Sequence, residues 1–338
     1  MNIFYLLFAP IFILFINHIL IKNNFLQSLT GDRHQLFIEN KNIPLSGGLF
    51  LFFFSVLFFI NEIKFYLFFI IFLIGILSDI KILKSAKIRF LIQIITIITL
   101  VINFDLIIND LRIPFLNFLL ENKIFSYLFF SFCLLIVTNG TNFIDGLNGL
   151  VLGYYIIVLS FILNLGMIND YESINILIIN YMIILSYLLM FNFLNKLYLG
   201  DSGSYFLGFL VGVLLIIIYK QNPIFSPFYI VLLLWYPCFE NLFSIIRKYR
   251  FNLSPLKADN KHLHQLLFYY YNKRLNFSKL LSNNIASLTI NSVNLIFFTL
   301  ASNYIYNSFA QIVIIILLIS IYILLYFLLF NFRFNKNN

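Results

Sequence analysis

The stretch SFAQIVIIILLISIYILLYFLLFN, residues 308–331, contains no acidic or basic side chain. About 20 apolar residues carry a helix across the hydrocarbon core of a bilayer, so this stretch predicts a membrane-spanning helix. Similar apolar runs recur along the whole chain. Counted together, they give eleven expected spans: 2–22, 44–61, 64–80, 88–104, 124–140, 147–166, 174–193, 204–220, 226–246, 285–303 and 308–331.

The composition supports the same fold class. Of the 338 residues, 62% are hydrophobic and 10% are charged, which excludes a water-soluble globule. We therefore predict an all-α, polytopic membrane bundle of about 10–11 transmembrane helices, forming one domain over residues 1–338. The first run lacks a basic flank and a small-residue cleavage site, so it is expected to be a retained span. Cys133 and Cys238 lie in apolar runs and are expected to be packing residues, not disulfide or zinc ligands.

The basic residues predict the orientation of the bundle. One set of alternate connections holds 18 of the 22 Lys and Arg residues, and the other set holds only Lys64, Arg112, Lys123 and Lys220. Because basic loops stay in the cytoplasm during insertion, the N-terminus is expected outside and the C-terminus inside. The cytoplasmic connections are then about 23–43, 78–88, 139–148, 194–203 and 247–284. The net charge of +9 reflects this bias, and no nucleic-acid partner is expected.

The clustered Asp, Asn, His and Gly residues all fall in these inner connections. In GDSGS, residues 200–204, Asp201 and Ser202 stand at the start of an apolar helix. Free N–H groups there suit a phosphate and the carboxylate suits Mg²⁺, although an ordinary helix cap has the same sequence. If the helices form a bundle, the five connections converge at one face, where a site for a soluble substrate beside the membrane is expected.

A second polar run places Asn139, Asn142, Asp145 and Asn148 at intervals of three, on one face of a helical turn. Their oxygens suit a metal ion or a nucleobase and ribose. The alternative is a capped turn at the membrane interface, but four such residues beside a bilayer are costly.

Two further clusters stand in the remaining inner connections. Asp79 is followed by Lys81, Lys84 and Lys87, which suit either lipid headgroup anchoring or a binding role. His262 and His264 alternate in KHLHQ. No Cys or further His completes a zinc site at a recognised spacing, so a phosphate-facing or acid–base role is favoured.

Taken in order, the five connections resemble those of the polyprenyl-phosphate N-acetylhexosamine-1-phosphate transferases. Residues 139–153 are similar to the family's Asn-rich Asp-Gly-Leu-Asp-Gly-Leu segment, with Asn148 for the second Asp, and residues 199–208 match its Gly-Asp-x-Gly-Ser segment. Residues 259–265 resemble Asp-Arg-x-His-Leu-His-His, with Asn260 and Gln265 as departures. The remaining matches are Pro44, Gly47 and Gly48 in the first connection, and Pro237, Glu240, Arg247 and Lys248 before the last.

The resemblance implies a membrane enzyme that starts bacterial cell-wall or surface-polysaccharide synthesis. Such an enzyme transfers a HexNAc-1-phosphate from a UDP-sugar to polyprenyl (undecaprenyl) phosphate, with Mg²⁺ or Mn²⁺ as cofactor, and releases UMP. It also suggests a homodimer in the bacterial inner (plasma) membrane, with the active site on the cytoplasmic face. The pair His262–His264 followed by Gln265 favours a GlcNAc-type donor over UDP-MurNAc-pentapeptide, whose transferases typically carry three consecutive His.

Site roles follow from the same resemblance. Asp201 with Asn142 is expected to hold the metal ion, while Asp145, Asn139 and Asn148 bind the nucleotide. His262, His264 and Arg247 are expected to face phosphates or sugar. The lipid phosphate is expected to be attracted by Lys41, Lys81 and Lys87.

One departure concerns Ser78, which stands where the family usually has the first of two adjacent aspartates. A phosphate monoester is already largely ionised at neutral pH, so the acceptor needs positioning more than deprotonation. Activity is expected to survive, with Asp79 orienting the site. The alternative is a non-catalytic lipid-binding or transport protein on the same scaffold, but the chain shows no internal repeat and its polar clusters lie at span ends.

Overall fold

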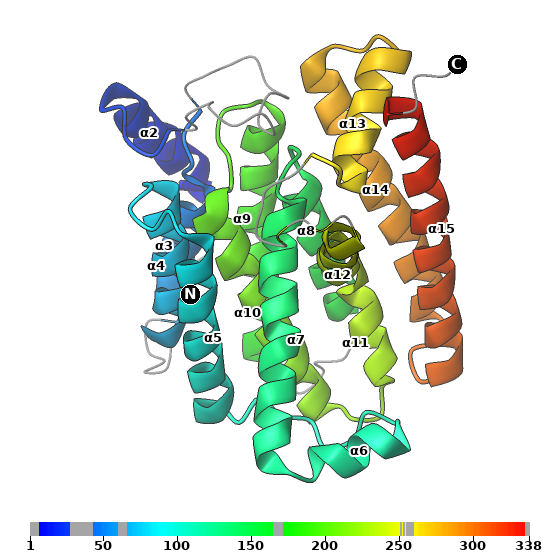
Figure 1. Cartoon of the computed structure of the whole chain (residues 1–338). Helices are drawn as coiled ribbons and strands as arrows, with labels where there is room; N and C mark the ends of the chain where they lie inside the picture. Colours follow the sequence, from blue (N-terminus) through cyan, green and yellow to red (C-terminus); the bar gives the residue numbers. More distant parts are fainter. Residues whose placement is uncertain are drawn as a thin grey trace.

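The computed structural model describes residues 7–27, 43–59, 66–164, 172–250, 252, 254 and 260–334. In this part of the chain the fold is all-helical, as predicted, and the described segments form one bundle (Figure 1). The helices are α2 (Ala9–Lys22), α3 (Gly47–Phe59), α4 (Tyr66–Asp79), α5 (Ala86–Asn103), α6 (Pro114–Leu120), α7 (Lys123–Ile144), α8 (Leu150–Asn164), α9 (Glu172–Phe193), α10 (Gly200–Gln221), α11 (Pro227–Leu233), α12 (Trp235–Arg250), α13 (Leu263–Arg274), α14 (Lys279–Ser302) and α15 (Ser308–Phe334).

Each of the eleven predicted spans coincides with one apolar helix or helix pair. Among the described residues, six helices are long and apolar enough to cross a membrane, and the bent pair α11–α12 makes a seventh. The helices α2, α3, α4 and α8 are apolar but shorter than 18 residues. The predicted polytopic membrane bundle is thus confirmed, while the count of full-length spans is six or seven by length. Two helices, α6 and α13, lie in segments that were predicted as connections.

Helix α10 forms the centre of the bundle. Its span is 89% buried inside the protein, compared with 28% for the peripheral α5 and α15. It packs against α3, α4 and α7, and small residues allow the close approach. A Cβ atom built on Gly75 of α4 would lie 2.3 Å from the backbone Cα of Ser202. The two helices can approach this closely only because residue 75 has no side chain. Gly75 therefore allows α4 to pack directly against the first turn of α10.

The bend between α11 and α12 has a defined chemical cause. Pro237 has no backbone N–H and so cannot bond the carbonyl of Leu233, four residues earlier. The hydroxyl of Tyr154 on α8 donates to that carbonyl at 2.8 Å instead. The two helices meet at an angle of 72°. The buried Tyr154 thereby satisfies a backbone group that would otherwise be unpaired inside the membrane.

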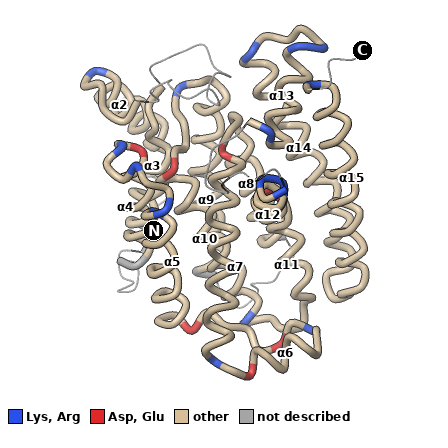
Figure 2. The backbone as a smooth tube through the Cα atoms, in the orientation of Figure 1, with Lys and Arg blue, Asp and Glu red and all other residues tan. Residues whose placement is uncertain are grey.

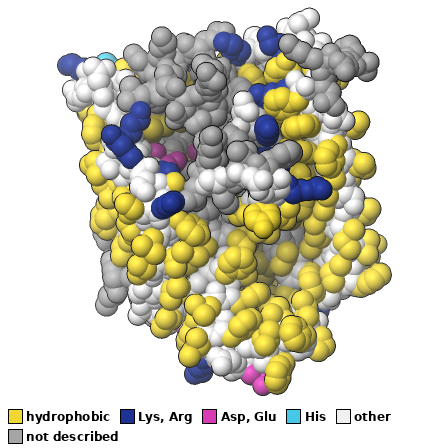
Figure 3. Space-filling view, in the orientation of Figure 1, with side chains coloured by type: hydrophobic (Ala, Val, Ile, Leu, Met, Phe, Trp, Pro, Cys, Tyr) yellow, Lys and Arg dark blue, Asp and Glu magenta, His cyan; other side chains and the backbone are white. Residues whose placement is uncertain are grey.

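Charge is distributed unevenly along the bundle. Figure 2 shows most Lys and Arg residues toward the end that carries the α4–α5 and α9–α10 connections, with few at the α6 end. Figure 3 shows hydrophobic side chains over much of the surface below them. The separation agrees with the charge bias read from the sequence.

At the α6 end, Arg112 ties together three connections. Its guanidinium donates to four backbone carbonyls and one hydroxyl on segments about 110–200 positions away: Tyr306, Pro223, Ile224, Phe225 and the Oγ of Ser308. Three of these bonds are 2.9 Å or shorter. Arg112 therefore holds the α10–α11 and α14–α15 connections beside α6.

Arg112→Met is expected to lower the free energy of unfolding by about 2 kcal/mol, because several charge-assisted hydrogen bonds are lost together. Thermal unfolding in detergent measures this change. Lys123→Met, an exposed basic residue at the same end, is the control and should stay within about 0.5 kcal/mol of the wild type. Equal stability of the two variants would contradict the assigned role.

Candidate active site

The predicted inner connections meet at one end of the bundle, as expected. The backbone N–H of Tyr198 donates to the carbonyl of Pro44, and the carbonyl of Tyr198 accepts the N–H of Gly47. These bonds link the segment before α3 to the α9–α10 connection. Asp79, at the end of α4, contacts the start of α10. A Cβ on Gly146 would lie 2.5 Å from Nε2 of His264, so the α7–α8 turn touches the first turn of α13.

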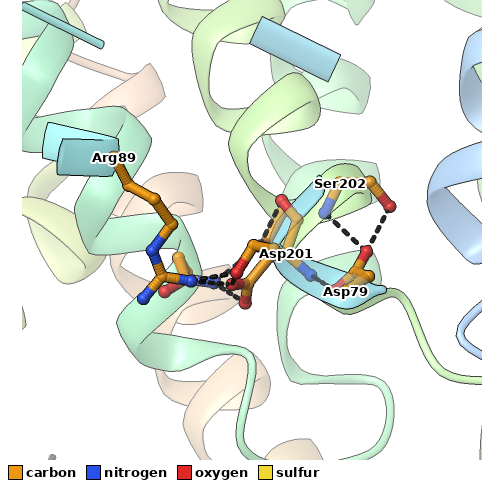
Figure 4. A network of polar contacts seen from close by, with 7 residues as sticks. Asp79, Arg89, Asp201 and Ser202 are labelled. Carbon is orange, nitrogen blue, oxygen red and sulfur yellow. Dashed lines mark hydrogen bonds and ion pairs between the residues drawn. The ribbon is translucent and has the colours of Figure 1, made fainter. Parts of the chain in front are cut away.

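Asp79 caps the N-terminus of α10 from another helix. Its Oδ1 accepts the N–H of Asp201 at 2.8 Å, and its Oδ2 accepts the N–H and the hydroxyl of Ser202 at 3.0 and 2.7 Å (Figure 4). Gly200 allows the approach because its φ is +76° and a Cβ there would lie 2.8 Å from Asp79 Oδ2. The carboxylate thus satisfies N–H groups that have no partner within α10. The structure thus gives Asp79 a helix-capping position, and its orienting role in a reaction stays a prediction.

Asp79→Asn is expected to lower the free energy of unfolding by about 1–2 kcal/mol. The new amide keeps one acceptor oxygen but turns an NH₂ group toward the N–H donors of α10. Thermal unfolding in detergent is the measurement. Asp110→Asn is the control, since the exposed Asp110 also accepts two hydrogen bonds that water can replace, and it should lose less than half as much. A smaller loss for Asp79→Asn than for Asp110→Asn would refute the capping role.

The carboxylate of Asp201 lies at the centre of a polar cluster. Its Oδ2 accepts from the Oγ of Ser78 at 2.5 Å and from Nη1 of Arg89 at 2.8 Å, and its Oδ1 accepts from Nδ2 of Asn142 at 2.7 Å (Figure 4). Asn142 also donates to the Oγ of Ser204 at 3.0 Å. Four helices, α4, α5, α7 and α10, therefore supply one site, and the predicted pair of Asp201 and Asn142 is brought together.

Arg89 was not among the predicted site residues. Sequence reasoning counted it only as one of the basic residues of the inner connections. Ser85 accepts the N–H of Ile88 and caps α5, which places Arg89 in the first turn of that helix. The side chains of Arg89 and Asp201 keep 22% and 29% of their surface exposed, so this ion pair lies at the wet edge of the bundle. An Arg after a helix-capping Ser was the available signal.

Ser78 links Asp201 and Arg89 within the cluster. Its hydroxyl donates to Asp201 and also accepts from Nη1 of Arg89. A hydroxyl can bridge a cation and an anion in this way because it is both donor and acceptor. Ser78 is thus part of the Asp201 cluster and not a neutral gap in it.

The residues of the α7–α8 turn occupy different environments. Asp145 caps the C-terminus of α7, and burial together with the charges of Asp201 and Asp79 raises the pKa of its carboxyl well above the usual range. Asn139 is half-buried and donates to the carbonyl of Leu135. Asn148 is buried, with its N–H bonded to Asn283 and its amide to Asn195. Asp145 therefore feels the Asp201 cluster, while Asn148 fastens the turn to α14 and to the α9–α10 connection.

Helix α12 contacts the histidine segment, which contains His262 and His264. Arg247 is buried and donates to the carbonyl of Lys261 at 2.6 Å, directly before His262. His264 is fully buried and stacks on His262 with 5.5 Å between the ring centroids. Arg247 therefore supports the backbone from which the two histidines project.

The predicted lysines divide into two groups. Lys81 lies in the turn that follows Asp79, and Lys87 lies in the first turn of α5. Both side chains are exposed. Lys41 and the motif residue Asp259 lie outside the described residues. Figure 3 shows acidic side chains at the surface between basic ones on this side of the bundle. The side chain of Asp201 keeps 29% of its surface exposed, so the Asp201 cluster is open to solvent.

The oxygen donors at Asp201 suit a hard cation. Within the described ranges, no three His, Cys, Asp or Glu side chains form a metal-binding group. Mg²⁺ usually takes one or two carboxylates and completes its shell with water and substrate phosphates. The carboxylate of Asp201, the amide of Asn142 and the hydroxyl of Ser204 offer such ligands, so the residues present fit this ion.

Comparison with known proteins identifies the segment that carries most of this cluster. The family model described as Glycosyl transferase family 4 matches residues 63–219. Over that stretch, the chain is similar to glycosyl transferase family 4. This family 4 segment, residues 63–219, includes Asp79, Arg89, Asn142, Asp145 and Asp201, and the match supports the family expected from the connections.

Three relatives align with parts of the chain. The probable undecaprenyl-phosphate N-acetylglucosaminyl 1-phosphate transferase of Bacillus subtilis is 34% identical over 160 residues, or 46% of this chain and 44% of the relative. The decaprenyl-phosphate N-acetylglucosaminephosphotransferase of Mycolicibacterium smegmatis is 30% identical over 39% of this chain and 37% of its own. A putative UDP-N-acetylglucosamine–dolichyl-phosphate N-acetylglucosaminephosphotransferase of Saccharolobus solfataricus is 32% identical over 31% and 33%. The chain thus spans less than half the length of the curated relatives it matches.

Proposed function

We propose that the protein transfers an N-acetylhexosamine-1-phosphate, in particular GlcNAc-1-phosphate, from a UDP-sugar to a polyprenyl phosphate. The observation that carries this proposal is the Asp201 cluster, in which Ser78, Arg89 and Asn142 converge on one carboxylate at the N-terminus of α10. It lies in the segment that matches glycosyl transferase family 4, and the names of the relatives describe this class of transfer. The products are polyprenyl-diphosphate-sugar and UMP.

The reaction joins two anions, and the site contains groups that reduce their repulsion. An oxygen of the polyprenyl phosphate attacks the β-phosphorus of the donor, and the bond between that phosphorus and the bridging oxygen breaks to release UMP. Arg89 at the edge of the cluster neutralises developing negative charge. The exposed Lys81 and Lys87 attract the lipid phosphate to the same end of the bundle.

The cation that fits the site is Mg²⁺, with Mn²⁺ as a substitute, held by Asp201 and Asn142. When bound, it supplies a positive charge that neutralises and orients the donor diphosphate. Asp145, at the C-terminus of α7, and Asn139, within the same helix, bind the nucleotide. His262 and His264 face the phosphates or the sugar.

Asp79 has an orienting role and not a nucleophilic one in this proposal. Its two carboxylate oxygens accept three hydrogen bonds from the first turn of α10. The acceptor phosphate has its second pKa near 6, so about nine tenths of it is ionised at pH 7 and no base is required. Positioning of two phosphates is the remaining task, and rigid helix ends suit it.

The bias of basic residues toward that end (Figure 2) supports a site on the cytoplasmic face of the bacterial inner membrane. There the enzyme meets a soluble nucleotide sugar and a lipid phosphate together. Its product would begin a cell-wall or surface polysaccharide.

The test uses the purified full chain in detergent or nanodiscs with undecaprenyl phosphate and Mg²⁺. A panel of UDP-GlcNAc, UDP-GalNAc and UDP-MurNAc-pentapeptide is supplied, and mass spectrometry identifies the lipid product. A lipid-linked GlcNAc diphosphate with release of UMP supports the proposal. A muramyl product would change the donor, and binding of polyprenyl phosphate without any transfer would indicate a lipid-binding protein.

A further inference from the structure

A buried carboxylate outside the family 4 segment contacts the histidine segment. Glu240, on α12, has no exposed surface. Its Oε1 lies 2.8 Å from Nδ1 of His262, and its Oε2 accepts the hydroxyl of Tyr322 on α15 at 2.6 Å. Three elements that are far apart in the sequence thus meet at one carboxyl group.

Burial makes these two contacts important for Glu240. An ionised carboxylate loses its hydration inside a protein, and it is tolerated only when hydrogen bonds or opposite charge compensate it. The hydroxyl of Tyr322 donates to Oε2, and Oε1 shares a hydrogen bond with Nδ1 of His262. Because an ionised carboxylate can only accept, its bond with His262 requires a proton on Nδ1.

The ring of His262 is fixed from several other sides. Phe143 stacks on it with a centroid distance of 5.8 Å, and His264 stacks on it at 5.5 Å. The backbone N–H of His262 donates to Oε1 of Gln265 at 3.2 Å. Phe143 directly follows Asn142, the residue that bonds Asp201. The orientation of this ring is thus coupled to the α7 turn that forms the Asp201 cluster.

We infer that Glu240 and Tyr322 are positioning residues that hold His262 in the Nδ1–H tautomer. In the neutral ring, Nε2 is then the basic nitrogen that exchanges protons or hydrogen bonds with the substrate. The inference deepens the proposed function and rests on it for the role in transfer. It adds α12 and α15, which lie beyond residues 63–219, to the helices that form the proposed active site.

Nitrogen-15 NMR of histidine-labelled protein in nanodiscs tests the tautomer without any activity assay. The chain has four histidines, and the His262 signals are assigned by their loss in His262→Gln. The wild type is expected to show a protonated Nδ1 and a basic Nε2 for this ring. An Nε2–H tautomer in the wild type would overturn the inference, whatever the enzyme does.

Substitutions test the positioning. Glu240→Leu removes the acceptor and should lower kcat about 100-fold, whereas Glu240→Gln retains a neutral acceptor and should lower it about 10-fold, with KM changed less in both. The Nδ1–H signal should be lost in the Leu variant and retained in the Gln variant. A folded Leu variant with unchanged spectrum and kcat would contradict the inference.

Tyr322→Phe keeps the ring and removes one hydrogen bond, so it tests the same contact if the Leu variant does not fold. It should lower kcat about 10-fold. Tyr229→Phe is the matched control, because Tyr229 is equally buried and its hydroxyl makes no hydrogen bond to the described residues. Equal kcat values for the two variants would exclude Tyr322 from the arrangement. Absence of transfer by the wild type would refute the proposed function but leave the tautomer measurement valid.

Discussion

Asp201→Asn is expected to reduce sugar-phosphate transfer by about 1,000-fold or more. The substitution removes the negative charge that pairs with Arg89 and the carboxylate that would hold Mg²⁺, but the side chain keeps its shape. Incorporation of labelled GlcNAc-1-phosphate into an organic-soluble lipid measures the loss. The folded protein should change in stability by about 1 kcal/mol or less, because the ion pair is partly exposed to water.

Asp105→Asn is the matched control for that experiment. Asp105 also pairs with a basic side chain, Lys220, at 3.2 Å, but Asp105 follows the C-terminus of α5, whereas Arg89 lies in the first turn of that helix. It should retain wild-type transfer. Retention of transfer by Asp201→Asn at saturating Mg²⁺ would remove Asp201 from the active site. Removal of Mg²⁺ with EDTA should also abolish wild-type transfer, and Mn²⁺ should restore it.

Gly75→Ala is expected to destabilise the protein by about 3 kcal/mol and to abolish transfer with it. The new methyl group would lie 2.3 Å from Cα and 2.6 Å from the backbone N of Ser202. Backbone atoms cannot rotate away, so α4 must separate from α10 and the hydrogen bonds of Asp79 must lengthen. Size-exclusion chromatography and thermal unfolding in detergent report the folded fraction.

Gly212→Ala on α10 is the control for this packing prediction. Its methyl group would meet Cδ2 of Leu134 at 2.8 Å, and the end of a leucine side chain can move. The higher helix propensity of Ala, about 1 kcal/mol, offsets part of the strain. This variant should fold and retain transfer. If Gly75→Ala folds as well as Gly212→Ala, the close packing of α4 on α10 is not required.

Local patterns account for the part of the fold that could be predicted. Apolar length predicts spans such as residues 308–331, and the bias of Lys and Arg predicts which connections share an end. Asp79, Asn142 and Asp201 were then expected in one place, and their hydrogen bonds confirm it. The helix α13 was missed because its sequence is too polar for a span and was assigned to a long connection.

Contacts between distant helices account for what was missed. Arg89 and Asp201 are 112 positions apart, and no local pattern pairs them. The contact of Glu240 with Tyr322 likewise depends on how α12 and α15 pack. Asn148 is a different case. It fits a motif that was predicted to bind substrate, but in the structure it forms hydrogen bonds with Asn195 and Asn283. Residue type and spacing indicate chemistry, whereas partners depend on the assembled bundle.

The cap on α10 has a consequence for biogenesis. Asp79 and the N–H groups that it accepts are separated by 122 positions, so the ribosome completes α4 long before α10 emerges. Until then the carboxylate must remain hydrated at the membrane surface, and α10 enters the bilayer with an open first turn. These two helices can therefore dock only after α10 has been synthesised, and the Asp201 cluster is complete only when they have docked.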